Sequence, residues 1–310
     1  MKISVVIPVY NAEKYVQQAV ESALQFSEVS EVILIEDKSP DNALEVCRML
    51  AEKYDKVKFI QHPDKENHGA GPSRNLGIEN VTGDFITFLD ADDYYLPNRF
   101  DAEKILFQNP EVEGVYGGLG VHYYSQKAKQ QYYSVFEDRL STVYKEHHPK
   151  EVFPGLTHMR GSFGIITLNA LTIRKSSLLN KMNILFKPLR FHEDTEFLFR
   201  LSYYLHLYPG ILNQPIAMRG VHEDNRITDI ETKKIKPSIT RVLLWNEVYN
   251  WAYQEKTMPE DFKIHIKRMY LSFEIANASF LKKMSMLTKF AVKDSKIISK
   301  GIYNINFRPF

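Results

Sequence analysis

The sequence predicts an α/β fold in which the first hundred residues form a parallel, doubly wound sheet and the C-terminal part is mainly helical. Three observations support this prediction. Short apolar runs rich in β-branched residues alternate with helical patterns up to about residue 100. Polar side chains follow these runs, which places them at one edge of such a sheet. Beyond Pro237 the pattern is mainly helical, with a break near Met258 and Pro259.

Alternation of strand and helix in the first half requires crossover connections, which are right-handed. Asn11 is well placed to cap the first helix. The expected elements, in order, are strand 2–10, helix 12–26, strand 31–35, a helix from residue 41, strand 57–60, a loop and helix over 69–80, and strand 85–89.

The second half has a less regular pattern. A polar stretch, 137–155, suggests a flexible or acceptor-facing insertion. An acidic segment at 192–201 predicts the start of a helix. The other expected elements are helix 97–107, strands 114–124, 131–135 and 164–168, and a helix at 175–180.

Composition permits a sizeable core. The chain has 310 residues, of which 44% are hydrophobic. Its single cysteine, Cys47, lies in a helical pattern and is expected to be a buried structural thiol. Met1 leads directly into a strand pattern without a signal-peptide layout, and no apolar run approaches the roughly 18 residues of a membrane span. We therefore expect a cytoplasmic protein, with peripheral contact at the inner face of the membrane as an alternative.

Charge is distributed unevenly along a chain whose net charge is +2. Residues 231–310 carry 15 Lys and Arg against 7 Asp and Glu, a net charge of +8. Such a basic region can meet anionic lipid, an anionic acceptor or nucleic acid, or it can be a solvated face. No nucleic-acid-binding module is recognisable, so we expect no nucleic-acid partner and keep peripheral membrane contact as a hypothesis.

A buried strand that ends in three carboxylates is the most informative feature of the sequence. Residues 85–89 are apolar, and Asp90, Asp92 and Asp93 follow them. Close negative charges repel one another and resist desolvation, so they favour a bound cation, most simply a divalent metal with oxygen ligands. The alternative is an acidic loop in solvent, in which Asp92 or Asp93 caps the helix that Pro97 begins.

Other polar groups at strand ends complete a nucleotide diphosphate site. Tyr10 is placed to pack on a base, Asp37 to accept from its N–H, and a metal to neutralise the diphosphate. Arg74 and the amides around Gly69 and Gly71 are placed to assist with phosphate. No Gly-x-Gly-x-x-Gly segment follows the first strand and no Walker-type Gly-Lys-Ser/Thr occurs, which counts against dinucleotide oxidoreductases and loop-type ATPases.

Four motifs, taken in this order, resemble those of the family-2 glycosyltransferases. They are SVVIPVYN at 4–11, EDKSPD at 36–41, GPSRNLG at 71–77 and LDADD at 89–93. The resemblance implies a Rossmann-like nucleotide-binding mixed sheet of the A-type glycosyltransferase (GT-A) fold with a mainly helical C-terminal extension. It implies a catalytic domain over 1–230, with a nucleotide-binding half at 1–100 and an acceptor half at 101–230, followed by the extension at 231–310.

The resemblance also implies roles for single residues on the donor side. Asp90 and Asp92 form its Asp-x-Asp motif, with Asp92 as the most direct ligand of Mn²⁺ or Mg²⁺. The implied nucleotide-sugar-binding residues are Pro8, Tyr10, Asp37, Arg74, Asp90 and Asp93. Two departures stand out: Glu36-Asp37-Lys38 replaces the usual Asp-Asp-Gly, and Ser73 replaces an alanine. Lys38 can therefore alter which nucleotide is preferred.

A second acidic motif of the family is matched by Glu193 and Asp194. The resemblance implies that Asp194 is the base of an inverting displacement, with Glu193 beside it in the catalytic motif. Alternatively, both acids only favour a helix N-terminus. The segment 219–228 resembles the family's Arg-x-x-His loop, in which His222 contacts metal or diphosphate, Arg219 or Arg226 pairs with phosphate, and the run to residue 236 forms a lid. A surface histidine is the alternative.

The resulting hypothesis is an inverting, metal-dependent glycosyltransferase of hexosyl or N-acetylhexosaminyl type. It moves a sugar from a nucleotide diphosphate donor, foremost a UDP-sugar, to a hydroxyl of a saccharide or lipid-linked acceptor in surface polysaccharide or glycolipid synthesis. One alternative is a nucleotidyltransferase, which usually needs a glycine-rich basic loop after the first strand; residues 11–14 do not form one. A non-catalytic sugar-nucleotide or glycan-binding protein is the other.

Overall fold

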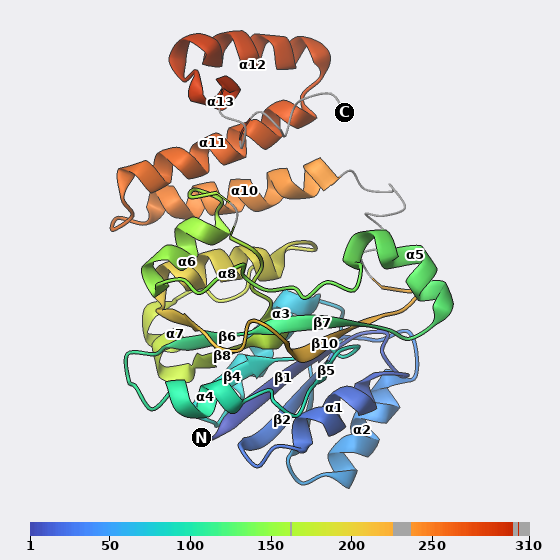
Figure 1. The fold of residues 1–310 in the computed structure, drawn as a ribbon. Helices are drawn as coiled ribbons and strands as arrows, with labels where there is room; N and C mark the ends of the chain where they lie inside the picture. The colour runs from blue at the N-terminus through green and yellow to red at the C-terminus, as the bar shows by residue number, and fades with distance from the viewer. Residues whose placement is uncertain (162, 226–236, 300–302, 304–310) are drawn as a thin grey trace. The chain divides into compact units, whose positions relative to one another are not determined.

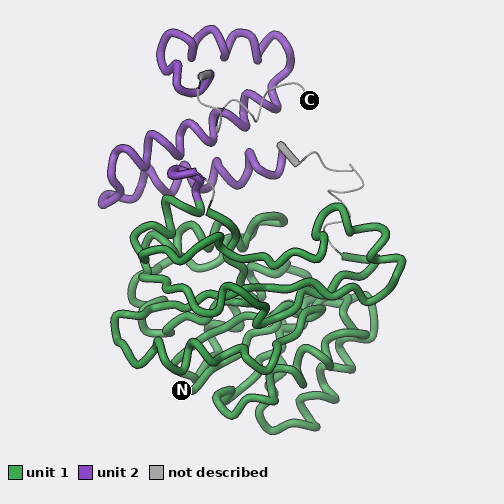
Figure 2. Tube along the Cα trace, in the orientation of Figure 1, with its two compact units in different colours: residues 1–156, 163–225 green, residues 157–162, 226–310 purple. Residues whose placement is uncertain are grey.

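The computed structural model describes residues 1–161, 163–225, 237–299 and 303. These residues belong to two compact units (Figure 2). Unit 1 comprises Met1–Leu156 and Phe163–Asn225, and unit 2 comprises Thr157–Ser162 and Arg226–Phe310. The domain boundary expected at residue 230 lies outside the described residues, so it stays a prediction.

The core of unit 1 is a seven-stranded mixed sheet (Figure 1). The first four strands in the chain, β1 to β4, pair in parallel in the order β3-β2-β1-β4. Strand β8 pairs antiparallel with both β4 and β6, and β9 is parallel to β6. The strands, in sheet order, are β3 (Val57–Gln61), β2 (Val29–Glu36), β1 (Ile3–Val9), β4 (Phe85–Phe88), β8 (Leu171–Arg174), β6 (Gly114–Tyr116) and β9 (Leu207–Pro209). The predicted α/β class with a mixed sheet is confirmed.

Helices cover both faces of the parallel part, as the reversal of strand order requires. Helices α1 (Val16–Leu24) and α2 (Ala43–Lys53) pack together on one face, and α3 (Ala70–Glu79) lies on the other (Figure 1). The inward stripe of α1 is fully buried against the sheet and comprises Val16, Ala19, Val20 and Ala23. Cys47 of α2 lies in the core, where burial raises its pKa to about 12, so the predicted structural thiol is confirmed.

A second, three-stranded sheet brings distant loops of unit 1 together. Its order is β5 (Tyr94–Tyr95), β10 (Pro215–Val221) and β7 (Gly118–Tyr123). Strand β10 is antiparallel to β5 and parallel to β7. Because β5 follows the acidic loop directly, this pairing places the loop after β10 beside the loop after β4.

Several expectations for the second half were wrong. The strand expected at 131–135 is the end of helix α5 (Gln126–Phe136). Ser125 caps this helix by accepting from the amide of Ala128, and Ala128 and Tyr132 bury one face four residues apart. The strand expected at 164–168 is only an isolated bridge between Gly164 and Val143.

The remaining helices of unit 1 differ from the expected bounds or were not expected. The irregular stretch predicted at 137–155 ends in helix α6 (Pro149–Leu156), and the helix expected from Pro97 begins later, as α4 (Asp101–Leu106). Asn11 does not cap α1, because its φ is 54° and the helix starts five residues later with Tyr15 at its N-cap. Helices α7 (Lys175–Lys181) and α8 (Glu193–Tyr204) lie where the sequence predicted helices.

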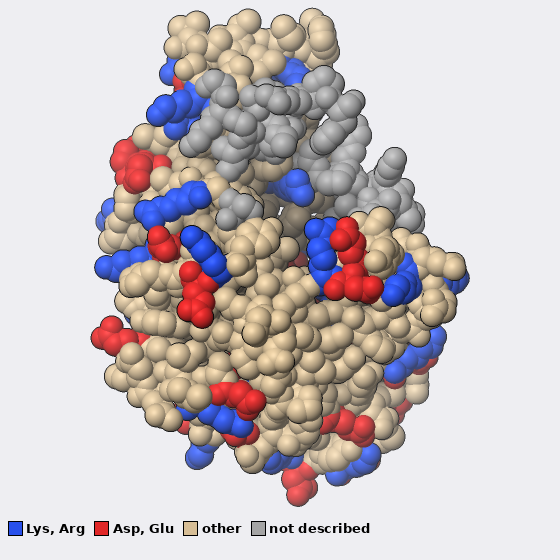
Figure 3. Space-filling model, in the orientation of Figure 1, with Lys and Arg blue, Asp and Glu red and all other residues tan. Residues whose placement is uncertain are grey.

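The described C-terminal part of unit 2 is mainly helical, as predicted. It contains α10 (Pro237–Gln254), α11 (Glu260–Asn277), α12 (Phe280–Lys293) and α13 (Lys296–Ser299). No helix in the described part of the chain has the length and apolar character needed to cross a membrane. On the face shown in Figure 3, Lys and Arg side chains are interspersed with Asp and Glu on the described part of unit 1.

A buried carboxylate ties the first strands together. Glu31 of β2 is 3% exposed and accepts hydrogen bonds from the Ser4 hydroxyl (2.5 Å), the Thr82 amide (2.6 Å) and the Lys58 ammonium group (2.6 Å). Burial by itself raises the pKa of Glu31, but the hydrogen bonds from Lys58, Ser4 and Thr82 outweigh it and lower the pKa to about 2.

We expect Glu31→Gln to lower the free energy of unfolding by about 3 kcal/mol at neutral pH. Because the pKa of Glu31 is depressed in the folded state, this stabilisation is present above the unfolded pKa, about 4.5, and is lost as the pH falls through about 2. Urea unfolding of wild type and variant at neutral and acid pH measures the difference. As a control, Glu45→Gln on the exposed face of α2 should cost about 1 kcal/mol or less. A Glu31→Gln difference that is equal at both pH values would contradict the linkage.

Candidate active site

The polar groups that follow β1 and β2 lie at one edge of the sheet. In the parallel register Val9 is opposite Glu36, and the Asp37 amide donates to the Val9 carbonyl oxygen (2.9 Å). Pro8 is the penultimate residue of strand β1, and Tyr10 just beyond the strand is 54% exposed, so its ring is open to a ligand. The structure therefore brings the predicted nucleotide-pocket residues Pro8, Tyr10 and Asp37 together.

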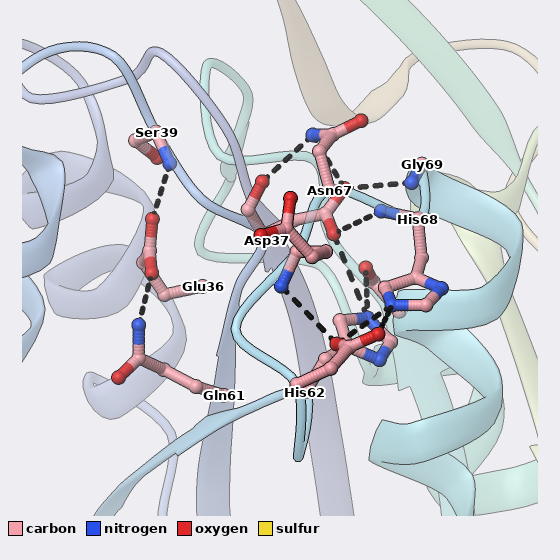
Figure 4. A network of polar contacts seen from close by, with 11 residues as sticks. Glu36, Asp37, Ser39, Gln61, His62, Asn67, His68 and Gly69 are labelled. Atoms are coloured by element: carbon pink, nitrogen blue, oxygen red, sulfur yellow. Dashed lines mark hydrogen bonds and ion pairs between the residues drawn. The ribbon is translucent and has the colours of Figure 1, made fainter.

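Asp37 organises the loop before α3 (Figure 4). It is 2% exposed, and its carboxylate accepts from the amides of His68 (2.7 Å) and Gly69 (2.7 Å) and from the side-chain amide of Asn67 (3.0 Å). The Oδ1 atom, which accepts from the His68 amide, also lies 3.6 Å from His62 Nε2. The predicted contact with a base stays a prediction.

Two histidines adjoin Asp37 and were not predicted from the sequence. The rings of His62 and His68 lie 4.2 Å apart, and His62 Nε2 is 3.1 Å from the Ser73 hydroxyl. A hydrogen bond to Asp64 raises the pKa of His68, whereas burial lowers the pKa of His62. Ser73, where the sequence departs from its resemblance, thus contacts a histidine that an alanine would not.

A buried arginine links the two acidic motifs. Arg74 of α3 is 3% exposed; its Nη2 donates to Asp90 Oδ1 (2.6 Å) and its Nη1 to Glu193 Oε1 (3.3 Å). Burial alone lowers the pKa of Arg74, but the charges of Asp90, Glu193 and Asp194 outweigh burial and raise it. One guanidinium therefore positions carboxylates from the loop after β4 and from the first turn of α8.

Asp92 meets the loop after β10. Its Oδ2 lies 3.2 Å from His222 Nε2 and accepts from the Asn225 side-chain amide (3.1 Å). The ring of Tyr15 stacks on His222 with centroids 4.6 Å apart, and Tyr124 donates to the Asp92 carbonyl oxygen (3.2 Å). The structure thus unites Asp92 and His222, which are 130 residues apart.

Asp93 points inward from the same loop. It is 3% exposed and accepts from the side-chain amide of Asn169 and from the amide of Gly220 (2.7 Å). Burial, followed by the charges of Asp92 and Asp90, raises the pKa of Asp93 well above its usual range. A Cβ at Gly220 would lie 1.9 Å from the Asp92 carbonyl oxygen, so only glycine permits this close approach. The predicted contact of Asp93 with the nucleotide sugar stays a prediction; its observed bonds hold the loop in place.

Asp194 lies in the first turn of α8, beside the buried end of the Arg74 network. It is partly exposed, and its Oδ1 accepts from the Thr195 amide (2.7 Å). Glu193 is 1% exposed and contacts Arg74. Of the two acids, Asp194 is therefore the one that solvent or an acceptor can reach, while Glu193 is placed to position its neighbours.

The chain matches the sequence profile described as glycosyl transferase family 2 over residues 4–172, more than half of its 310 residues. It belongs to this family. The match includes the pocket residues at the ends of β1 and β2, Arg74 and the acidic loop. It ends before Glu193, Asp194 and His222, so the structure alone joins these residues to the family's donor side.

Two relatives with similar sequences are also named as glycosyltransferases. The chain is 28% identical to the uncharacterized glycosyltransferase YibD of Escherichia coli K12, over 97% of this chain and 86% of that protein. It is 38% identical to an uncharacterized glycosyltransferase of Haemophilus influenzae over 34% of this chain, and spans 43% of that relative's length.

Two solved structures share the fold. Staphylococcus aureus TarS 1-349 in complex with UDP-GlcNAc has a TM-score of 0.64 at 17% identity, covering 99% of this chain and 89% of that one. The mannosyltransferase PcManGT from Pyrobaculum calidifontis, in complex with GDP-Man and Mn²⁺, has a TM-score of 0.54 at 14% identity, covering 98% and 84%. Both show that this family-2 glycosyltransferase has the GT-A fold.

Lys38 stands where the family usually has glycine, and its backbone explains the difference in part. Its φ is 57°, in the left-handed region that favours glycine, so the turn keeps the glycine-type conformation. Glu36 braces the same turn by accepting from the Ser39 amide (2.5 Å) and the Gln61 side-chain amide (2.7 Å), as Figure 4 shows. The Lys38 side chain pairs with Glu66.

The donor chemistry around Asp92 fits a divalent ion that a nucleotide diphosphate also ligates. Among the described residues, no three His, Cys, Asp or Glu side chains converge to hold a metal unaided. Asp92 and His222 converge within 3.2 Å, and Mg²⁺-like ions commonly combine one or two carboxylates with phosphate oxygens. Burial and then the charge of Asp92 raise the pKa of Tyr124, which indicates the negative potential that a cation requires.

Sequence reasoning missed the side chains that hold these groups in place. They are Tyr15, Asn67, Tyr124, Asn169 and Asn225. No local signal marks them, because each acts on a residue at least 30 positions away. Arg219 packs over the Phe136 ring at 5.2 Å. The predicted phosphate contact of Arg226 and the predicted lid to residue 236 lie outside the described residues.

Proposed function

We propose that this family-2 glycosyltransferase is inverting and metal-dependent, and moves a sugar from a nucleotide diphosphate to a hydroxyl acceptor. The observation that carries this proposal is the path Asp90–Arg74–Glu193, which joins the Asp-x-Asp loop to the turn that bears Asp194. A single displacement needs donor-binding groups and a base at fixed separation. The Arg74 bridge supplies a rigid link between them.

On the donor side, the exposed ring of Tyr10 is proposed to pack on the base, and the Asp37 carboxylate is the proposed acceptor for a base N–H. We propose Pro8 as a wall of the same pocket, and Arg74, Asp90 and Asp93 as groups that shape the diphosphate end. A UDP-sugar carrying a hexosyl or N-acetylhexosaminyl group is the proposed donor. TarS has been solved with UDP and UDP-GlcNAc, and PcManGT with GDP-Man, which supports a nucleotide-sugar donor for this chain.

In the proposed reaction the acceptor oxygen bonds to the anomeric carbon as the bond from that carbon to the diphosphate oxygen breaks, so the configuration inverts. Asp194 takes the acceptor proton, and the nucleoside diphosphate leaves with the bonding electrons. Asp92 and His222, with Asp90 beside them, would hold Mn²⁺ or Mg²⁺, whose chemistry is to neutralise charge on the departing diphosphate. Glu193 holds Arg74 and so positions the turn of α8.

The proposed acceptor is a saccharide or lipid-linked hydroxyl in surface polysaccharide or glycolipid synthesis, in the cytoplasm or at the inner face of the membrane. Product analysis separates this proposal from the alternatives. A nucleotidyltransferase would release pyrophosphate. A non-catalytic sugar-nucleotide-binding protein would be stabilised by donor without turnover.

A thermal-shift screen of nucleotide sugars with and without Mn²⁺ tests the donor and metal assignments. A matching donor at a hundredfold excess over its Kd should stabilise the fold by about 2.7 kcal/mol. Asp92→Asn should lose the part of the shift that depends on Mn²⁺, because it removes a charged metal ligand. The control Asp138→Asn, on an exposed carboxylate paired with Lys129, should behave as wild type. An Asp92→Asn protein with an unchanged Mn²⁺-dependent shift would overturn the metal assignment.

A further inference from the structure

Helix α12 of unit 2 carries four exposed large apolar side chains, more than any other described helix. Residues 280–293 have no fully buried side chain. Phe280, Leu281 and Val292 are 75%, 81% and 89% exposed, and Met284 is 47% exposed. Exposing side chains of this size costs free energy in water, so their grouping on one helix indicates a contact surface.

The helical period divides the side chains of α12 among three distinct faces. Met286, Leu287 and Phe290 pack against the small core formed by Ile275 and Ile297. The exposed apolar face comprises Phe280, Leu281, Met284, Thr288, Ala291 and Val292, which the helical period places side by side. A third, basic face comprises Lys282, Lys289 and Lys293. Because the packing face is already used, the apolar face is not needed to hold α12 in unit 2.

The positive charge of α12 indicates what kind of partner its apolar face would fit. Residues 280–293 contain four lysines and no Asp or Glu. In Figure 3 the outer surface where α12 lies in Figure 1 is largely without charge, with Lys and Arg side chains at its flanks. An apolar face bordered by lysines is the pattern of helices that lie in the plane of a membrane interface, with apolar side chains among acyl chains and lysines at anionic headgroups.

We propose that α12 docks the protein onto the surface of an anionic lipid membrane. Phe280, Leu281, Met284 and Val292 enter the headgroup and acyl boundary, while Lys289 and Lys293 contact lipid phosphates. Lys282 also lies 3.7 Å from Glu274, so it contributes less to this contact. The proposal goes beyond sugar transfer and does not depend on it, because docking is measured without any sugar nucleotide.

Vesicle co-sedimentation of the full chain tests the proposal. The protein should bind vesicles of mixed phosphatidylcholine and phosphatidylglycerol, bind vesicles of phosphatidylcholine alone much more weakly, and lose binding at high salt. Lys289→Glu/Lys293→Glu should weaken binding about tenfold or more. Leu281→Glu/Val292→Glu should abolish it. All four side chains are exposed, so circular dichroism and the melting temperature should not change.

Two control variants test whether binding depends on α12 itself or only on net charge and exposed apolar side chains elsewhere. Lys145→Glu/Lys150→Glu in unit 1 makes the same change in net charge at exposed lysines. Ile105→Glu, at a 70% exposed apolar residue of α4, makes the same kind of polar change. Both should bind as wild type. If they weaken binding as much as the α12 variants do, net charge or general stickiness explains the binding and the proposal is overturned.

Phe280→Trp supplies a readout at the helix itself. Its additional fluorescence, compared with that of wild type, should shift to shorter wavelength with anionic vesicles and be quenched by brominated lipid. A solvent-like emission with vesicles present would overturn the proposal. So would sedimentation showing a dimer that Leu281→Glu/Val292→Glu dissociates, because a second copy would then cover the apolar face.

Discussion

Asp194→Asn should reduce the rate of sugar transfer by about 10²- to 10⁴-fold while leaving donor binding in place. The side chain is partly exposed in the first turn of α8, next to Glu193, which Arg74 holds. Asparagine keeps the shape of aspartate and a carbonyl oxygen for the Thr195 amide, but it does not take a proton at neutral pH. The kcat for transfer, measured with a donor that stabilises the protein, reports the loss, and the donor-induced thermal shift reports binding.

Asp101→Asn is the matched control for this experiment. Asp101 also lies in the first turn of a helix, α4, and its side chain is 57% exposed. Its loss should remove only the favourable interaction with a helix N-terminus, about 0.3–1 kcal/mol of stability, and leave kcat unchanged. If Asp194→Asn transfers sugar as fast as the Asp101→Asn protein, Asp194 acts only on the helix and is not the base.

The strand ends at which the donor side is predicted could be located from the sequence because their determinants are local. Strands β1, β2 and β4 are mostly apolar, and a parallel sheet brings their carboxyl ends to one edge. Asp37 directly follows β2, and Asp92 lies four residues after the end of β4. Their approximate positions therefore follow from strand order alone.

The second half was harder to predict because local preference and tertiary packing point in different directions. Residues 131–135 contain β-forming Tyr and Val, yet the Ser125 cap and the inward face of Ala128 and Tyr132 make a helix. Asn11 is a good capping residue by type, but the loop holds its backbone at positive φ. The Ser125 cap and the helical spacing of Ala128 and Tyr132, considered together, would have predicted α5.

The contacts that hold the site residues in place also cannot be predicted from local sequence patterns. Asn169 donates to Asp93, which lies 76 positions earlier in the sequence. Tyr15, near the start of the chain, stacks on His222, near the end of unit 1. The pairing of β4 with β8 in the first sheet brings Asn169 to Asp93, whereas β10 of the second sheet leads into the loop that carries His222. A single sequence contains no signal for such pairs, whereas the carboxylates that they hold are marked by their place after a strand.

Arg74→Met should lower the free energy of unfolding by about 3–5 kcal/mol, because it removes the guanidinium that pairs with a buried carboxylate. Glu193 is 1% exposed and has Arg74 as its observed cationic partner, whereas the Asp90 side chain is 40% exposed and can turn toward water. Most of the loss should therefore come from Glu193. Urea unfolding of wild type and variant measures the difference.

Two further variants decide whether the loss comes from the buried charge. Arg48→Met removes an exposed arginine that pairs with Glu45 on α2, and should cost about 1 kcal/mol or less. Adding Glu193→Gln to Arg74→Met also removes the buried carboxylate charge, so the double variant should be more stable than the sum of the two single losses predicts. An Arg74→Met protein as stable as the Arg48→Met protein, or strictly additive losses, would mean that Arg74 does not couple the two acidic motifs. The position of Asp90 would then be set by its own loop and that of Asp194 by helix α8, and the link between donor and base that supports the transferase mechanism would be lost.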